Sequence, residues 1–317
     1  MTFSPLDLVR LHSGIIGITP THLRAILQAV HNQTFSFAEL FQLSATELRQ
    51  QFGLSEKVAQ ALITSDLAKA EATLMQLQTK RFEIITFLDE RYPPSFQRLA
   101  DKMPPILYVF GDTAQLAKAG VGFGGARDVS TQGLHATNQL ARSAVKEHGY
   151  TVISGHAKGV DEMAHQAALD AEGVTILVLP EGVLTFRLIE SLRAFWSEAA
   201  DRIVVVSQFA PHETWQARNA MIRNSTVIGL TQAFCVIEAG DEKGGTWAAG
   251  LTALSMNVPL CVLDYETPPS SALGNSKLIA KGGIPIPYNE ALLFPVMSAI
   301  PLPVDTTPVQ KSLFADS

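Results

Sequence analysis

Four short segments of the chain carry glycines and cations, and each of them follows a hydrophobic run. They are Gly124 to Arg127, Ser154 to Asp161, Arg223 to Ser225 and Lys243 to Trp247. Residues just past the strands of an open parallel α/β sheet line one crevice, so these segments are expected to meet along one edge. Glycines there expose backbone N–H groups at helix N-termini, and Arg or Lys adds a full positive charge. The combination suits a row of phosphates.

The residues expected to contact these phosphates are the glycines, cations and small polar residues of the four segments. They are Gly124, Gly125, Arg127, Ser154, Gly155, Lys158, Gly159, Arg223, Asn224, Lys243, Gly244, Gly245 and Thr246. The guanidinium of Arg127 has a fork geometry that fits a phosphate, although a structural Arg–carboxylate pair would also explain this residue. Lys158 is expected to project from a loop rim into the crevice, with a solvated surface lysine as the alternative.

Three neighbouring side chains are interpreted differently. Asp161, near a helix N-terminus, is expected to hold loop amides, because a carboxylate would repel an anionic ligand. His165, one helical turn later, is expected to be a hydrogen-bonded packing histidine and not a catalytic base. Trp215 precedes Arg223 in a loop, where it would either stack on a base or belong to the core.

One of the four segments also bears on catalysis. Lys243 to Trp247 is expected to open a helix that Thr246 caps, and it resembles the G-G-x-G-T-x-x-E phosphate loop of the nucleotide-hydrolysing LOG, or lysine-decarboxylase-like, group. That group has an acid/base glutamate three residues after the threonine, where this chain has Ala249. Walker-type spacing is also missing. We therefore predict a protein that is not an enzyme, with no catalytic residue and no cofactor.

An alternation of strand and helix patterns between residues 120 and 295 must position these segments. The strand-like runs are Val121–Phe123, Tyr150–Ser154, Val174–Leu179, Arg202–Val206, Ala233–Glu238 and Leu260–Leu263. Helical stretches separate them. This order predicts an α/β domain with a Rossmann-like, doubly wound and mostly parallel sheet.

Residues 1–80 have helical periodicity without a strand signal and predict a small all-helical domain. Thr19 and Pro20 are expected to begin one helix, and Ser44 with Glu47 to form a capping box. The turn around Gly53 resembles the SAM or helix-hairpin-helix class, in which backbone amides contact DNA phosphates, although a packing module would show the same pattern. Residues 81–119 are expected to connect to the Rossmann-like domain, and the proline-rich residues 296–317 to form a flexible tail.

The composition indicates an ordinary globular protein of 317 residues, 47% of them hydrophobic and 17% charged. The net charge of −6 argues against indiscriminate polyanion binding but permits a local basic groove. No apolar stretch approaches the roughly 20 residues of a membrane span, so a cytoplasmic location without a membrane partner is expected. Cys235 and Cys261 lie inside hydrophobic runs, which favours buried thiols and gives no metal-ligand spacing.

The segment from Ser154 to His165 resembles a family signature. It matches the S-G-x-A-x-G-x-D-x-x-A-H pattern of the DNA-processing protein A family, also called DprA or Smf. Gly125 to Arg127 stands where that family carries G-S-R, and Arg223-Asn224 matches part of its R-N-R-x-I-x-G-L segment. Tyr92-Pro93 and Pro104 to Tyr108 are similar to the segment that precedes the Rossmann fold in that family. Altogether, the resemblance covers roughly residues 6–287.

Departures from this pattern indicate a divergent member. Pro180 to Arg187 replaces the usual G-T-G-L-D-x-x-Y-P segment, Ser225 replaces the last arginine of R-N-R, and Gly245 to Trp247 replaces S-G-S. The resemblance implies a homodimer that binds single-stranded DNA and assists loading of the RecA recombinase, in recombination, natural transformation or another DNA-processing pathway. The alternative is a LOG-like nucleotide-binding sensor or hydrolase that uses the same crevice for one mononucleotide.

A further short motif lies close to residue 317. Gln310 to Phe314 resembles the Q-L-[SD]-L-F peptide by which bacterial replication proteins dock on the sliding DNA clamp, and it departs from that peptide at Lys311. Such a peptide places a glutamine and a Leu-Phe pair in adjoining pockets. Gln310, Leu313 and Phe314 are therefore candidate clamp contacts, with a chance similarity as the alternative.

Overall fold

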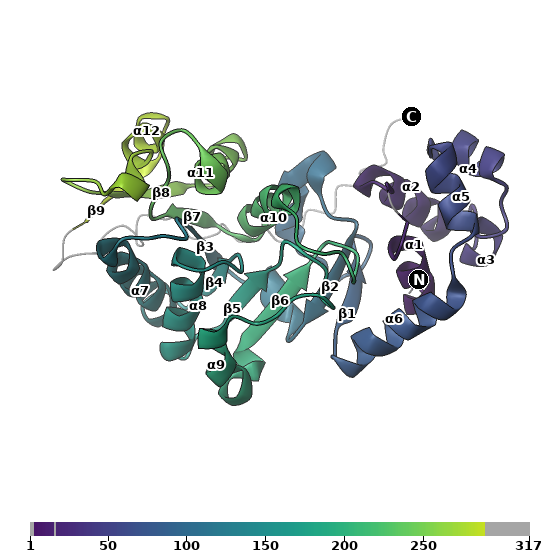
Figure 1. The fold of residues 1–317 in the computed structure, drawn as a ribbon, viewed down its shortest axis with the longest axis horizontal. Helices are drawn as coiled ribbons and strands as arrows, with labels where there is room; N and C mark the ends of the chain where they lie inside the picture. The colour runs from purple at the N-terminus through teal and green to yellow at the C-terminus, as the bar shows by residue number, and fades with distance from the viewer. Residues whose placement is uncertain (1–2, 16, 289–317) are drawn as a thin grey trace.

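The computed structural model of the chain describes residues 3–15 and 17–288. Within them, nine strands form one mixed sheet in the order β1-β2-β6-β5-β4-β3-β7-β8-β9 (Figure 1). The strands are β1 (Glu83–Thr86), β2 (Ile106–Phe110), β3 (Gly120–Gly124), β4 (Thr151–Ser154), β5 (Thr175–Val178), β6 (Ile203–Ser207), β7 (Ala233–Val236), β8 (Leu260–Asp264) and β9 (Ile284–Pro287).

The sheet is doubly wound, as the sequence predicts. From β3 the chain proceeds outward through β4, β5 and β6, and then returns to the other side of β3 with β7, β8 and β9, all parallel. The strand order therefore reverses between β3 and β7, where Gly122 faces Phe234. In such sheets a crevice opens beyond the carboxyl ends of the strands at this switch point.

Helices cover both faces of the sheet (Figure 1). One face carries α7 (Thr131–Lys146), α8 (Val160–Asp170) and α9 (Arg193–Glu198), and the other carries α10 (Ala217–Leu230), α11 (Gly244–Ser255) and α12 (Asn275–Ala280). The 3-10 helices are η1 (Pro94–Lys102), η2 (Thr113–Ala117), η3 (Glu190–Leu192), η4 (Ala200–Arg202) and η5 (Ser270–Ala272). None of the helices described is long and apolar enough to cross a membrane.

The central strands are hydrophobic on both sides because both faces are covered. In β6, Val204 and Val206 belong to the core under α10 and α11, whereas Ile203 and Val205 belong to the core on the opposite face. A parallel strand buried on two faces appears in the sequence as a continuous apolar run, which explains why the six predicted runs became β3 to β8.

Six helices precede the sheet. They are α1 (Pro5–His12), α2 (Pro20–His31), α3 (Phe37–Leu40), α4 (Ala45–Phe52), α5 (Glu56–Ile63) and α6 (Leu67–Thr79). The predicted caps are confirmed, since the Thr19 hydroxyl accepts from the His22 N–H and Ser44 and Glu47 form a capping box. Gly53 ends α4 with a left-handed φ of 65°.

The helical region packs directly on the sheet. Leu8, Leu27 and Leu62 share one buried cluster with Tyr108 of β2 and Val205 of β6. The His12 ring stacks on Tyr108, and its Nδ1 lies 3.0 Å from the phenol oxygen. The segment 81–119, expected to connect the two parts, itself supplies the edge strand β1 and its antiparallel neighbour β2. The domain boundaries at residues 80 and 119 stay a prediction.

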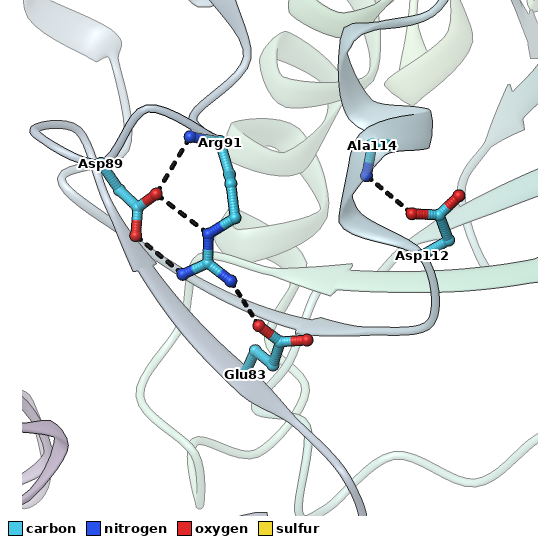
Figure 2. A network of polar contacts seen from close by, with 5 residues as sticks. All are labelled: Glu83, Asp89, Arg91, Asp112 and Ala114. Atoms are coloured by element: carbon cyan, nitrogen blue, oxygen red, sulfur yellow. Dashed lines mark hydrogen bonds and ion pairs between the residues drawn. The ribbon is translucent and has the colours of Figure 1, made fainter.

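Arginine 91 ties together the loop after the edge strand β1. Its guanidinium donates to both carboxylate oxygens of Asp89, at 3.0 and 2.8 Å, and also to Glu83 (Figure 2). The hydrogen bonds from Arg91 lower the pKa of the Asp89 carboxyl, and those same bonds raise the pKa of the guanidinium. Nearby, Asp112 accepts from the Ala114 N–H at 3.0 Å and begins η2. Charges on an edge strand also discourage pairing with another sheet.

Candidate nucleic-acid interface

A cleft of about 430 Å³ lies at the switch point, beyond the carboxyl ends of β3 and β7. We call it the switch-point cleft. It is lined by residues of the loop after β3, the start of α8, one side of α10 and the start of α11. Nine of the thirteen predicted phosphate contacts line it, namely Gly124, Gly125, Arg127, Arg223, Asn224, Lys243, Gly244, Gly245 and Thr246. The four sequence segments therefore meet at the cleft. Three of them follow β3, β4 and β7, whereas Arg223 to Ser225 lies inside α10, which packs beside these strand ends.

Two further predicted residues act by letting the loops pack closely. Gly159 has a φ of 84°, and a Cβ there would come within 2.5 Å of the Ala126 carbonyl oxygen and 2.6 Å of the Arg127 carbonyl oxygen. A Cβ on Gly155 would stand 1.6 Å from a guanidinium nitrogen of Arg223. Both glycines are thus required for the shape of the cleft and do not line it.

Ser154 and Lys158 also lie outside the lining, for opposite reasons. Ser154 is completely buried, and its hydroxyl donates to the Phe123 carbonyl at 2.8 Å, which ties β4 to β3. Lys158 is exposed in the loop between β4 and α8, next to the lining residue Ala157. It stands at the outer rim as a surface lysine.

Arg223 and Asp161 form a buried pair at one side of the cleft. The guanidinium lies 3.7 Å from the carboxylate, and the side chains are 10% and 9% exposed. Burial raises the pKa of Asp161, although Arg223 and hydrogen bonds from Ser154 and the Ala157 N–H oppose this, and burial lowers the pKa of Arg223. Among the described residues, the Nε of Arg223 has no hydrogen-bond partner. A buried donor beside a cleft favours an incoming anion, because an unmade hydrogen bond there is costly.

Asp161 and His165 have the structural roles that the sequence predicts. The Asp161 carboxylate is held beside the Ala157 N–H and the Arg223 guanidinium, both of which favour its charged form. His165 is fully buried, with Nδ1 2.6 Å from the Thr175 hydroxyl and Nε2 2.7 Å from the Gly155 carbonyl oxygen. Burial lowers its pKa to about 3, so the ring is neutral and holds the loop after β4 in place.

Arg127 is exposed and forms no ion pair within the part of the chain that the structure describes. Its guanidinium carbon instead lies 6.0 Å from the centre of the Trp215 ring. Trp215 is 49% exposed, so the core alternative for this residue is wrong. An arginine beside an open indole face is an arrangement that suits both a phosphate and a stacked base.

The N-terminus of α11 differs from the prediction in one detail. The helix begins at Gly244, its N-cap is Lys243, and no side chain caps it. Thr246 is therefore inside the first turn, and the prediction that it caps the helix is wrong, because the left-handed Gly244 starts the helix earlier. The first N–H groups of a helix have no intrahelical acceptor. Asn224 fixes this turn by donating to the Gly245 carbonyl at 3.1 Å.

Met221 and Glu238 are among the lining residues that were not predicted as contacts. Met221 and its neighbour Ile222 are 45% and 47% exposed on α10, and Met221 lines the cleft. Two adjacent apolar residues directly before an arginine were a usable signal in the sequence. Glu238 is fully buried and accepts from the Ser130 N–H at 3.1 Å, the Ser130 hydroxyl and the Tyr265 hydroxyl at 3.0 Å.

The cleft offers cations and backbone N–H groups that can bind an anion. Its carboxylates, Asp161 and Glu238, are each held by buried partners, and Ala249 occupies the place of the hydrolase glutamate. Within residues 3–15 and 17–288, no group of three His, Cys, Asp or Glu side chains is placed to hold a metal ion. The candidate clamp contacts Gln310, Leu313 and Phe314 lie outside the described residues.

Comparisons with known proteins agree with this architecture. The model of a family described as DNA recombination-mediator protein A matches residues 83–293. Protein Smf of Escherichia coli strain K12 is 28% identical over 77% of this chain and 64% of its own length, and Protein Smf of a Synechocystis strain is 30% identical over 77% of this chain and 61% of its own length. The chain thus covers less than two thirds of either relative.

Two solved structures are similar in fold. DNA processing protein A (DprA) of Streptococcus pneumoniae matches 95% of this chain and 100% of its own, with a TM-score of 0.77 and 21% identity. DNA processing protein A of Helicobacter pylori matches 67% of this chain and 94% of its own, with a TM-score of 0.56 and 26% identity. Because the Streptococcus pneumoniae structure matches 95% of this chain, the similarity in fold includes most of the helical region as well as the sheet.

Proposed function

Because the chain belongs to the DNA recombination-mediator protein A family, we propose that it binds single-stranded DNA in the switch-point cleft and acts as a mediator without catalysing a reaction. A single-stranded DNA binding mode is described for the Helicobacter pylori protein. The observation that carries the proposal is the buried guanidinium of Arg223, which faces the cleft with one donor unpartnered among the described residues, beside the exposed Arg127.

Each part of the cleft has a role in this proposal. Arg127, Arg223 and Lys243 contact phosphates, and the N–H groups at the start of α11 add donors that need no charge. Trp215 offers a face for one base, which would be sequence-tolerant because every base has a π-face. The protein would therefore hold the backbone of a strand without selecting its sequence.

The absence of catalysis is a separate part of the proposal. A hydrolase would need a carboxylate free to exchange protons with water, and Asp161 and Glu238 are both engaged. We expect that the purified protein releases neither base nor phosphate from nucleoside monophosphates. Steady turnover that disappears in Arg127→Ala would overturn the non-enzyme proposal and favour the LOG-like alternative.

The partners remain proposals that rest on family membership and sequence. They are a RecA-type recombinase loaded on the bound strand, a second copy of the chain, and the sliding clamp through Gln310, Leu313 and Phe314. A cytoplasmic location is proposed with them. For the clamp, a peptide of residues 308–317 should bind in the micromolar range, and Leu313→Ala with Phe314→Ala should abolish binding measured by calorimetry.

The decisive experiment is a titration of a labelled single-stranded oligonucleotide at several salt concentrations, with nucleoside monophosphates as competitors. Three phosphate contacts predict that log K falls against log salt with a slope of about −2, at about 0.7 per contact. Mononucleotides should compete weakly, because they offer one phosphate. A flat salt dependence with strong mononucleotide competition would instead identify a nucleotide sensor.

A further inference from the structure

A second hollow, of about 610 Å³, lies between the end of α6, the end of β2 and the segment before β6. We call it the aromatic groove. Its floor contains Phe82, Phe110, Phe186 and Trp196. The Trp196 and Phe110 rings are stacked, with centroids 4.8 Å apart and planes 21° apart, and Phe82 packs 5.9 Å from Phe110. The volume falls in the range of roughly 300–1,000 Å³ that is common for ligand sites.

Three cations surround this floor. Lys80, Arg81 and Arg193 line the groove and are exposed. In the described ranges none of them forms an ion pair, and no acidic residue lines the groove. Aromatic faces ringed by free positive charge are what a single-stranded nucleic acid needs, because its bases stack while its phosphates are neutralised. An apolar peptide would not require the three charges.

The aromatic groove is joined to the switch-point cleft by the loop after β4. Phe186 packs edge-on against His156, with ring centroids 5.5 Å apart, and the Ile189 N–H donates to the His156 Nε2 at 3.3 Å. The next residue, Ala157, lines the switch-point cleft, and Lys158 beyond it is exposed. The loop after β4 thus lines the switch-point cleft at Ala157 and contacts the aromatic groove through the packing of His156 on Phe186.

From the aromatic faces, the three cations and this contact between the loops, we propose that the aromatic groove binds bases of the same DNA strand that occupies the switch-point cleft. The strand would pass over Lys158, which gives this exposed lysine a phosphate contact outside the cleft. The inference rests on the proposed function, because it extends the strand held there. It predicts that the groove contributes only when the oligonucleotide is long enough to reach it.

The test compares the binding of short and long oligonucleotides, of about 6 and about 20 nucleotides. Trp196→Leu and Arg193→Ala should each weaken binding of the long oligonucleotide, the first about tenfold through lost stacking, and leave the short one unchanged. Arg127→Ala should weaken both. Lys57→Ala, which removes an exposed lysine of α5 outside both hollows, is the matched charge control and should change neither.

Two further variants separate binding from folding. Trp196→Phe keeps an aromatic face and should retain most of the binding of the long oligonucleotide. Arg81→Gly removes a cation at a left-handed position, φ 58°, where glycine is unstrained, so it should lower the salt slope by about 0.7 without loss of thermal stability.

The outcomes distinguish the two proposals. If Arg127→Ala weakens both oligonucleotides but Trp196→Leu and Arg193→Ala weaken neither, the aromatic groove is not part of the DNA path and serves another ligand. If Arg127→Ala has no effect at either length, the proposed function itself fails. Quenching of tryptophan fluorescence by the long oligonucleotide should accompany binding and should be reduced in Trp196→Phe, and equal quenching in the two proteins would count against the groove.

Discussion

The turns at Gly53 and Gly244 each place a glycine with positive φ at a helix end, but their surroundings differ. Both glycines have positive φ, 65° and 85°, both lie at helix ends, and a Cβ on either would meet open space. At Gly53 the N–H already donates to the Arg49 carbonyl at 3.0 Å and closes α4. At Gly244 the N–H belongs to the uncapped first turn of α11, at the edge of the switch-point cleft.

This difference shows what turns an exposed glycine into a binding element. A helix C-terminus uses the glycine amide to satisfy its own carbonyls, whereas a helix N-terminus leaves amides without intrahelical acceptors. The cations near the two turns also differ, because the one beside Gly53 is paired and those beside Gly244 are not in the part of the chain that the structure describes. Arg49 is paired with Glu56 at 2.7 Å, while Arg127 and Lys243 form no ion pair within the described residues. The helical hairpin formed by α4, the Gly53 turn and α5 is therefore interpreted as a packing module, and the cleft as the site.

The largest effect is expected from Gly159→Ala. The residue has φ 84° and ψ −122°, and its new Cβ would collide with the backbone oxygens of Ala126 and Arg127, which cannot rotate away. We expect a loss of at least about 2 kcal/mol of unfolding free energy and a large loss of DNA affinity. Chemical denaturation and oligonucleotide titration measure the two.

Gly149→Ala is the matched control for that variant, with φ 63° and open space around its Cβ. It should cost about 1 kcal/mol of stability and leave DNA affinity intact. Equal effects of the two substitutions on affinity would mean that loop packing at Gly159 does not shape the site.

Comparing Arg127→Ala with Arg49→Ala tests whether the charge beside the cleft, and not the charge beside the Gly53 turn, contributes to DNA binding. Removing the exposed Arg127 should weaken single-strand binding about tenfold and reduce the salt slope by about 0.7, because one phosphate contact is lost. Removing Arg49 should change neither quantity, since Glu56 already neutralises it. Binding isotherms at several salt concentrations give both values, and a salt slope that falls equally for both variants would restore the helical hairpin as a DNA contact.

Acidification should destabilise both the contact between the helical region and the sheet and the loop behind the switch-point cleft. Burial lowers the pKa of His12, at the contact between helices and sheet, to about 4, and that of His165, behind the cleft, to about 3. The unfolded chain therefore takes up these protons first as the pH falls below about 6.5. Each histidine should remove up to about 1.4 kcal/mol of stability per pH unit from there down to its folded pKa.

The pH dependence of urea unfolding between pH 8 and 5 tests this expectation. His165→Gln should flatten the dependence, because glutamine carries no titrating group and can still donate to the Gly155 carbonyl. A variant that keeps the full pH dependence would show that other groups are responsible.

Gly244→Ala against Gly53→Ala should have the smallest effects. Both substitutions place a Cβ on a left-handed residue, so each should cost about 1 kcal/mol in thermal unfolding. Only Gly244→Ala should also weaken single-strand binding, by a few fold, because it reshapes the amides at the start of α11. Identical binding by the two variants would contradict a role for those amides.

The sequence predicted the parts whose signal is local or periodic. Six buried strands appear in the sequence as apolar runs because helices cover both faces of the sheet. The helix caps at Thr19 and Ser44 could be predicted because each depends on a residue only three positions away. The strands β1, β2 and β9 were not predicted. β1 and β9 are the two edge strands, and β9 alternates Ile with Pro, so neither burial on two faces nor a full hydrogen-bond ladder marks them in the sequence. β2 lies between β1 and β6 and is a buried apolar run, so its signal was present in the sequence and was overlooked.

The same division holds for the site. Glycines and cations after successive strands determined where the cleft would form, because parallel topology brings strand ends together. Tertiary packing decided that Arg223 is buried against Asp161 while Arg127 is exposed beside Trp215, and that Lys158 lies outside the lining. The burial of each cation depends on which distant loop covers it, and Gly155 admits the Arg223 guanidinium only once β4 and α10 are packed together.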